Sequence, residues 1–78
     1  MSSKYVMYDN SEYHIFPGTM NHADIVGGVA QTVTGAGFVC MHPKENRLVC
    51  YGYSETLKIG PGEDDEMILN AFMVRHDA

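Results

Sequence analysis

The chain has 78 residues, 45% of them hydrophobic, and a net charge of −5 from five basic and ten acidic residues. A chain of this length builds one thin core, so we expect a single domain over residues 1–78. Its apolar stretches are far shorter than the roughly 20 residues that cross a bilayer. The polar start also differs from a signal peptide, and we therefore expect a soluble cytoplasmic protein without a membrane partner.

The basic residues are scattered along the chain and form no run. Binding of nucleic acid depends on clustered lysine and arginine, so the sequence predicts no direct nucleic-acid contact. The excess of carboxylates instead favours a protein partner with a basic surface. The five residues concerned are Lys4, Lys44, Arg47, Lys58 and Arg75.

The first half of the chain predicts a hairpin followed by a short helix. Residues 4–9 and 12–16 are rich in Tyr, Val and Ile, and the "DNS" between them is a turn signal. In the following segment, residues 17–33, Asn21 or Thr19 is a candidate helix cap. Gly27 and Gly28 inside this helix predict an early stop or the close approach of another backbone.

The second half repeats this order. Residues 35–42 and 47–54 predict a second hairpin with "PKEN" at its turn, where Asn46 tolerates the left-handed conformation. A final helix over residues 63–76 is expected to open at Pro61 or Gly62 and to hold its acidic residues in the first turn. Its expected buried stripe is Met67, Ile68, Ala71, Phe72 and Val74.

These elements predict an α+β fold built from two ββα halves, since "IFPG" and "IGPG" each follow a hairpin and precede a helix. The expected architecture is a four-stranded, mainly antiparallel sheet with both helices on one face. The other sheet face would then be solvated or covered by a partner.

Both cysteines flank the second turn. A three-residue turn over 44–46 would set Cys40 opposite Cys50 and place His42 on the same face. Zinc would need His14 or His22 as a fourth ligand, and the paired ligand spacing of structural zinc sites is missing. We therefore predict no metal and no cofactor, with two buried thiols as the favoured interpretation. A disulfide is allowed in this register but disfavoured in a reducing cytoplasm.

The sequence predicts no enzyme and no catalytic residues. Nucleophilic catalysis needs a nucleophile beside a base that a third group orients, and the cysteines and serines show no such arrangement. A thin sheet of this size also leaves little room for a substrate cleft. Tyrosine is frequent and suits a surface that a partner buries. The predicted contact residues are Tyr51, Tyr53, Glu55, Asp64 and Asp65.

The runs "FPGTMNHADIV", "GAGFV" and "CYGYSETLKIGPGEDDEMI" resemble a pattern in small uncharacterised proteins of bacteriophages and prophages. The similarity spans most of residues 14–70 and implies a phage or mobile-element accessory protein that binds a host protein. The leading hypothesis is thus a small acidic inhibitor of host defence or of a nucleic-acid-processing protein, in the manner of anti-CRISPR proteins. The alternatives are a metal- or redox-active protein using Cys40, His42 and Cys50, or a homo-oligomer, such as a homodimer, that associates through a sheet edge.

Overall fold

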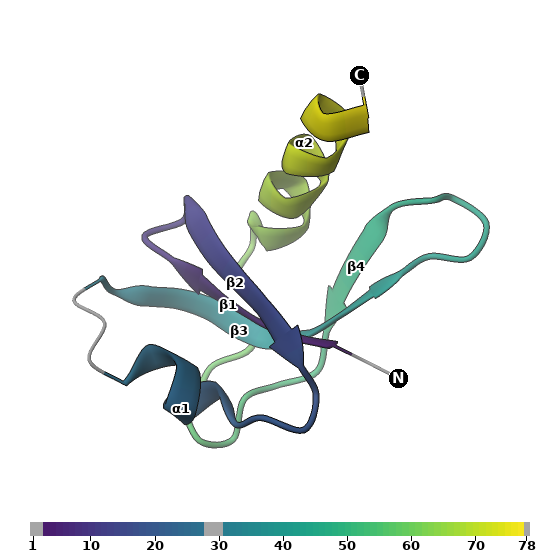
Figure 1. Cartoon of the computed structure of the whole chain (residues 1–78). Coiled ribbons are helices and arrows are strands. Elements are labelled where there is room, and N and C mark those ends of the chain that lie inside the picture. Colours follow the sequence, from purple (N-terminus) through teal and green to yellow (C-terminus); the bar gives the residue numbers. More distant parts are fainter. Residues whose placement is uncertain (1–2, 28–30, 78) are drawn as a thin grey trace.

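The protein is an antiparallel sheet with one short and one longer helix (Figure 1). The computed structural model describes residues 3–27 and 31–77, the segment 72–77 by its backbone alone. The strand order is β2-β1-β3-β4. This confirms the expected α+β class and the four-stranded antiparallel sheet. The elements are β1 (Ser3–Tyr8), β2 (Glu12–Pro17), α1 (His22–Val26), β3 (Val33–Met41), β4 (Leu48–Tyr51) and α2 (Asp65–Asp77).

The first hairpin forms where the sequence predicts it. Asp9 and Asn10 both have a φ of 52°, and the Ser11 amide donates to the Tyr8 carbonyl at 3.0 Å. Short polar side chains tolerate this left-handed backbone, which matches the twist of the flanking strands. The pairing then runs from Tyr8 opposite Glu12 to the far end of both strands.

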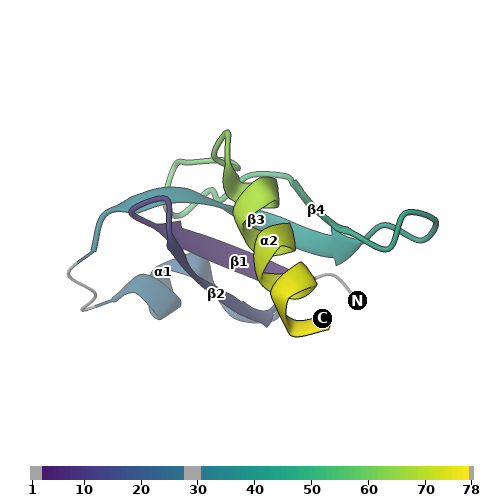
Figure 2. The ribbon, with the colours of Figure 1, turned by 90° about the horizontal axis from the view of Figure 1, so that it is seen from above.

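The two helices cover opposite faces of the sheet, whereas the sequence led us to expect both on one face (Figures 1 and 2). Tyr5 and Met7 of β1 belong to the core cluster that contains Leu69 of α2. Val6 and Tyr8 point the other way, into a cluster against which α1 packs. β1 therefore has no polar face, and its alternating side chains need cover on both sides. The sequence led us to expect a second sheet face that is solvated or covered by a partner. Over β1 both faces are instead covered by the chain itself, because Tyr5, Val6, Met7 and Tyr8 are all buried.

α1 is short for the reason that its glycines predict. It follows Asn21, whose φ of −86° and ψ of 144° are extended, although the Asn21 side chain makes no capping hydrogen bond. The helix ends at Val26, because Gly27 already has a ψ of 122°. Ile25 and Val26 are half-buried and pack against the cluster around Val6.

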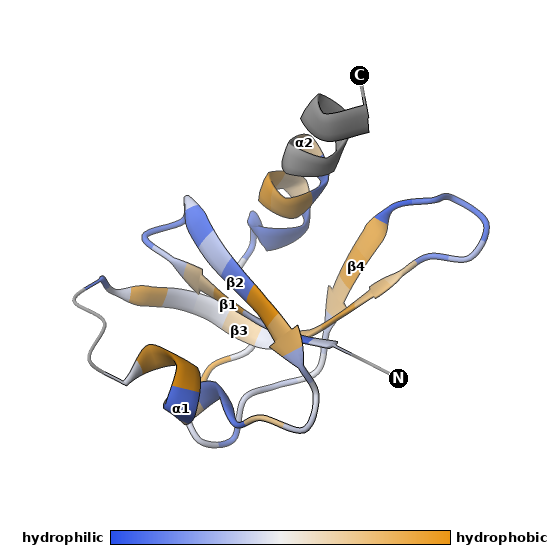
Figure 3. Ribbon diagram, viewed as in Figure 1, coloured by the Kyte–Doolittle hydropathy of each residue, from blue (hydrophilic) through white to orange (hydrophobic). Residues whose placement is uncertain are grey.

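The second hairpin has a register one residue away from the predicted one. Its loop contains four residues, since the His42 amide donates to the Arg47 carbonyl at 2.7 Å. The tip of this loop is hydrophilic (Figure 3). Asn46 has a φ of 53°, as expected for this position. Cys40 lies opposite Val49 and not opposite Cys50. The two thiols consequently project from opposite faces of the sheet, and both are free.

α2 begins at Asp65, later than the predicted opening at Pro61 or Gly62. Among residues 65–71 the fully buried apolar side chain is Leu69, which the expected stripe omitted, while Met67 of that stripe is 65% exposed. Ile68 is half-buried and packs against the core. Ala71 is exposed, and the side chains of Phe72 and Val74 lie outside the described part of the chain. No helix within residues 3–27 and 31–77 has the length and apolar character needed to cross a bilayer.

Candidate functional site

A hollow of about 310 Å³ opens on the side of the sheet that α1 covers. It lies where β1 and β3 run beside each other, because Lys4 and Phe38 are register partners. The N-terminus of α1 and the segment after β4 complete its walls. The lining residues are Lys4, Asn21, His22, Phe38, Tyr53, Glu55 and Thr56.

Phe38 and Tyr53 line the hollow, and Tyr51 lies beside it against Phe38. The rings of Phe38 and Tyr51 stack at a centroid distance of 5.6 Å and an interplanar angle of 25°. Tyr51 is 39% exposed and Tyr53 is 51% exposed. The ammonium of Lys4 lies 5.8 Å from the Phe38 ring centroid and donates to the Met20 carbonyl at 2.8 Å. One cation of the hollow is therefore already held by a carbonyl and a ring face.

His22 is buried and fixes the start of α1 against β3. Its Nε2 lies 2.9 Å from the Gly37 carbonyl oxygen, and because a carbonyl only accepts, Nε2 carries the hydrogen. The imidazole packs edge-on against Phe16 at 5.4 Å and against Phe38 at 6.3 Å. His22 is thus a hydrogen-bonded core residue whose ring also lines the hollow.

Gly52 lets the chain leave β4 beside the Phe38 ring. Its φ is 79°, and a Cβ at this position would lie only 2.6 Å from Phe38 Cδ1. A residue with a side chain is excluded by both the backbone conformation and the lack of space. The following segment therefore turns back over the sheet and carries Tyr53 and Glu55 to the hollow.

Ser54 anchors this segment from inside. Its side chain is fully buried, and its hydroxyl accepts the Leu57 amide at 3.2 Å. Its own amide donates to the Ile59 carbonyl at 2.9 Å, closing a tight turn in which Lys58 has a φ of 61°. Leu57 and Ile59 pack against the cluster around Val6. The residues on either side of Ser54 are consequently held at the hollow by a fixed turn.

The predicted contact residues divide into two groups. Tyr53 and Glu55 line the hollow, and Tyr51 stacks on Phe38 beside them. Asp64 is exposed near the start of α2 but is not part of the lining. Asp65 has no exposed side-chain surface, so it cannot touch a partner in this fold and leaves the proposed contact set.

Asp65 is buried because it ties α2 to the sheet. The Tyr5 hydroxyl donates to its Oδ2 at 2.5 Å, and the Gly62 amide donates to the same oxygen at 2.7 Å. A Cβ at Gly35 would overlap Oδ2, which is why this strand position holds a glycine. Burial, and then the hydrogen bond to Asp65, raises the pKa of Tyr5 well above its usual range.

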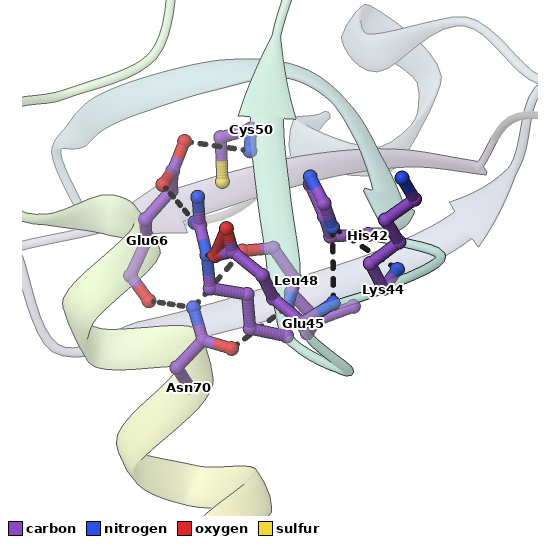
Figure 4. A network of polar contacts seen from close by, with 8 residues as sticks. His42, Lys44, Glu45, Leu48, Cys50, Glu66 and Asn70 are labelled. Carbon is purple, nitrogen blue, oxygen red and sulfur yellow. Dashed lines mark hydrogen bonds and ion pairs between the residues drawn. The ribbon is translucent and has the colours of Figure 1, made fainter.

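The residues of the metal or redox alternative do not converge. Cys40 is exposed on the side of α1, while Cys50 is half-buried on the side of α2. His42 Nδ1 accepts the amides of Lys44 at 3.2 Å and Glu45 at 3.1 Å within the loop (Figure 4). The His42 imidazole therefore stabilises the loop through its Nδ1. Within the part of the chain that the structure describes, no three His, Cys, Asp or Glu residues are grouped to hold a metal ion.

The proposed fourth ligands, His14 and His22, make contacts of their own elsewhere in the fold. His14 packs edge-on against Tyr8 at 5.4 Å, and His22 bonds to Gly37. Burial, reinforced by the nearby charges of Glu66 and Asp65, raises the pKa of the Cys50 thiol to about 11. A thiol with this pKa is almost wholly protonated at neutral pH and is a poor nucleophile.

Sequence reasoning missed most of the floor of the hollow. Lys4, Phe38 and Asn21 were assigned only to strands or to a cap, because they meet through pairings between distant segments. For His22 a local signal existed, since it follows a cap candidate on a helix that packs against the sheet. Its neighbours Phe16 and Phe38 could be identified only from the register.

No protein-family model, curated protein or solved structure matches this chain. The resemblance to small phage and prophage proteins therefore stays a prediction. The homodimer is likewise untested, although one edge of the sheet is closed: Glu66 and Asn70 of α2 bond to the outer backbone of β4 (Figure 4).

Proposed function

We propose that the protein is a non-enzymatic module that binds another protein through the surface around the hollow. The observation that carries the proposal is the gathering of Tyr51 and Tyr53, both exposed, beside the half-buried Phe38 and the acidic Glu55. Tyrosine combines a large apolar ring with a polar tip, and such residues dominate the centres of protein interfaces. The fixed turn around Ser54 holds Tyr53 and Glu55 in place, which reduces the entropy cost of binding.

The net charge indicates the chemistry of the partner. Ten acidic residues against five basic ones give the protein a negative field, which attracts a basic surface and repels nucleic acid. Proteins that hold nucleic acid present such basic surfaces. Together with the resemblance to phage proteins, this supports an inhibitor of a host defence or nucleic-acid-processing protein, acting in the host cytoplasm.

The positions of the nucleophilic side chains support binding over catalysis. Cys50 has a raised pKa, and Cys40 lies on the other face of the sheet. Among the histidines, His42 is engaged in its loop and His22 in the contact between α1 and β3. Each of these four side chains is thus either hydrogen-bonded within the fold or kept apart from a second side chain with which it could carry out acid-base or nucleophilic chemistry.

The proposal is tested by affinity capture from bacterial lysate on the immobilised chain. We expect a partner retained in stoichiometric amount by the unchanged protein and lost with Tyr53→Ala. The matched control is Met67→Ala. It removes an exposed apolar side chain far from the hollow in sequence, on α2, and this variant should retain the partner. Absence of a stoichiometric partner, or equal retention by Tyr53→Ala and the unchanged protein, would contradict the proposal.

A further inference from the structure

We propose that the hollow receives an arginine side chain of the partner protein, with its guanidinium stacked on Tyr53 and paired with Glu55. The inference rests on the proposed function and specifies what the partner inserts. It follows from the aromatic walls, the unpaired carboxylate and the acceptor groups of the lining.

The walls suit a planar cation. Tyr53 is 51% exposed and lines the hollow, whose volume of about 310 Å³ accommodates one long side chain. Guanidinium is flat, weakly hydrated and stacks on aromatic faces, whereas the ammonium of lysine is a compact and strongly hydrated charge. The shape and the ring therefore favour arginine.

The carboxylate of Glu55 is exposed and is available to pair with a cation from outside. Within the described residues the ion pairs between side chains join Arg47 to Glu45 and to Glu66, and none reaches Glu55. Lys4 lines the same hollow, but its ammonium donates to the Met20 carbonyl and lies over Phe38. Repulsion by Lys4 disfavours a second cation over Phe38 and leaves the Tyr53 ring as the stacking surface.

Further acceptors match the several donors of a guanidinium. Asn21 lines the hollow, and its side-chain amide makes no capping bond to α1. Thr56 adds a hydroxyl oxygen, 3.4 Å from the Ser54 hydroxyl. A guanidinium carries five N–H donors in a fixed plane, so it can bond to Glu55 and to one of these oxygens at once. Lysine offers only three donors around one nitrogen.

The inference is tested by NMR titration of the chain with N-acetyl-L-arginine amide. We expect saturable shifts at the backbone amides of Tyr53, Glu55 and Thr56, with a dissociation constant on the order of millimolar for so small a ligand. The citrulline analogue has nearly the same shape without the charge and should give no saturable shift. The lysine analogue should bind several-fold more weakly.

Two charge-matched variants locate the contact. Glu55→Gln should weaken the arginine analogue by about fivefold, the equivalent of about 1 kcal/mol. Asp64→Asn removes the same charge from an exposed acid outside the lining and should change the affinity less than about twofold. The dispersion of each variant's spectrum shows that it is folded.

Equal shifts with the citrulline analogue, shifts confined to other amides, or no response would overturn the arginine assignment. This failure is distinct from failure of the proposed function, because the titration examines the hollow without a partner. If the arginine analogue fails while a captured partner is still lost with Tyr53→Ala, the binding function stands and only its arginine anchor is refuted.

Discussion

The hydroxyl of Tyr5 donates to Asp65 Oδ2 at 2.5 Å and joins the central strand β1 to the first turn of α2, 60 residues later in the chain. Both side chains are fully buried. Asp65 Oδ1 has no hydrogen-bond partner among the described residues, so Oδ2 carries the hydrogen bonds of this carboxyl group. A buried carboxyl group that loses such a bond pays the full cost of its desolvation.

Tyr5→Phe should therefore destabilise the protein by roughly 1–3 kcal/mol, because it removes the hydroxyl and preserves the ring. The free energy of unfolding is measured by urea titration. The control is Tyr53→Phe, which deletes the same atom from an exposed side chain and should change stability by less than about 0.5 kcal/mol. Equal effects of the two variants would show that the bond to Asp65 contributes nothing measurable.

The contact between β3 and the start of α2 leaves no room for a methyl group. A Cβ at Gly35 would overlap Asp65 and lie 2.7 Å from the Gly62 amide nitrogen. Gly35→Ala should destabilise the fold by roughly 1–3 kcal/mol through overpacking. At Gly27 a Cβ would meet its nearest atom, the Ala23 carbonyl oxygen, at 3.6 Å. Gly27→Ala should thus change the urea midpoint little, and a similar loss in both variants would refute the steric argument.

α2 closes the outer edge of β4 with side chains. Asn70 Oδ1 accepts the Leu48 amide at 2.7 Å, and Asn70 Nδ2 donates to the Leu48 carbonyl at 3.0 Å. One turn earlier, Glu66 Oε2 accepts the Cys50 amide at 3.0 Å. These bonds satisfy backbone groups that an exposed edge strand would offer to other chains.

Asn70→Ala should cost roughly 1–2 kcal/mol of stability and speed hydrogen exchange of the Leu48 amide, since two bonds to that residue are lost. Exchange measured by NMR, together with urea unfolding, tests both parts. Met67→Ala changes an exposed position of the same helix and serves as the control. Unchanged protection of the Leu48 amide in Asn70→Ala would contradict the edge-closing role.

The sequence was sufficient for the strands, because period-two patterning and turn residues are local signals. It failed where a choice depended on distant atoms. Placing Cys40 opposite Cys50 required a three-residue turn. The segment instead forms a four-residue loop, which shifts the strand pairing by one residue. Leu69 is buried in place of the expected Met67. The side of α2 that meets the sheet is set by Asp65 and Asn70, which bond to Tyr5 and Leu48.

The candidate site was predictable only in part for the same reason. Tyr53 and Glu55, two of the five predicted contact residues, are near in sequence, and both line the hollow. Their contact with a partner stays a prediction. Asp65 looked like an ordinary acid at a helix start, and nothing local reveals that Tyr5 buries it. The pairing of Lys4 with Phe38 joins segments 34 positions apart, so the hollow itself could not be foreseen.

The two cysteines should differ in their reaction with iodoacetamide. Cys40 is exposed, whereas Cys50 is half-buried with a pKa raised to about 11, and only the thiolate reacts. At pH 8 we expect alkylation of Cys40 first, with Cys50 at least about tenfold slower. Mass spectrometry of timed samples identifies the modified residue, and Cys40→Ser should leave only the slow reaction. Comparable rates at both thiols would contradict the burial of Cys50.

Stability should fall at alkaline pH, partly through Cys50. Its thiol has a pKa of about 11 in the folded protein against about 9 ordinarily, so the unfolded chain loses this proton first. The stabilisation is thus fully present below about pH 9 and is lost as the pH rises through about 11. Urea unfolding at pH 8 and near pH 11 should show a smaller pH-dependent loss in Cys50→Ala than in the unchanged protein. The Tyr5 phenol, whose pKa is also raised, acts in the same direction at higher pH and persists in that variant. An identical loss in both proteins would show that Cys50 does not contribute.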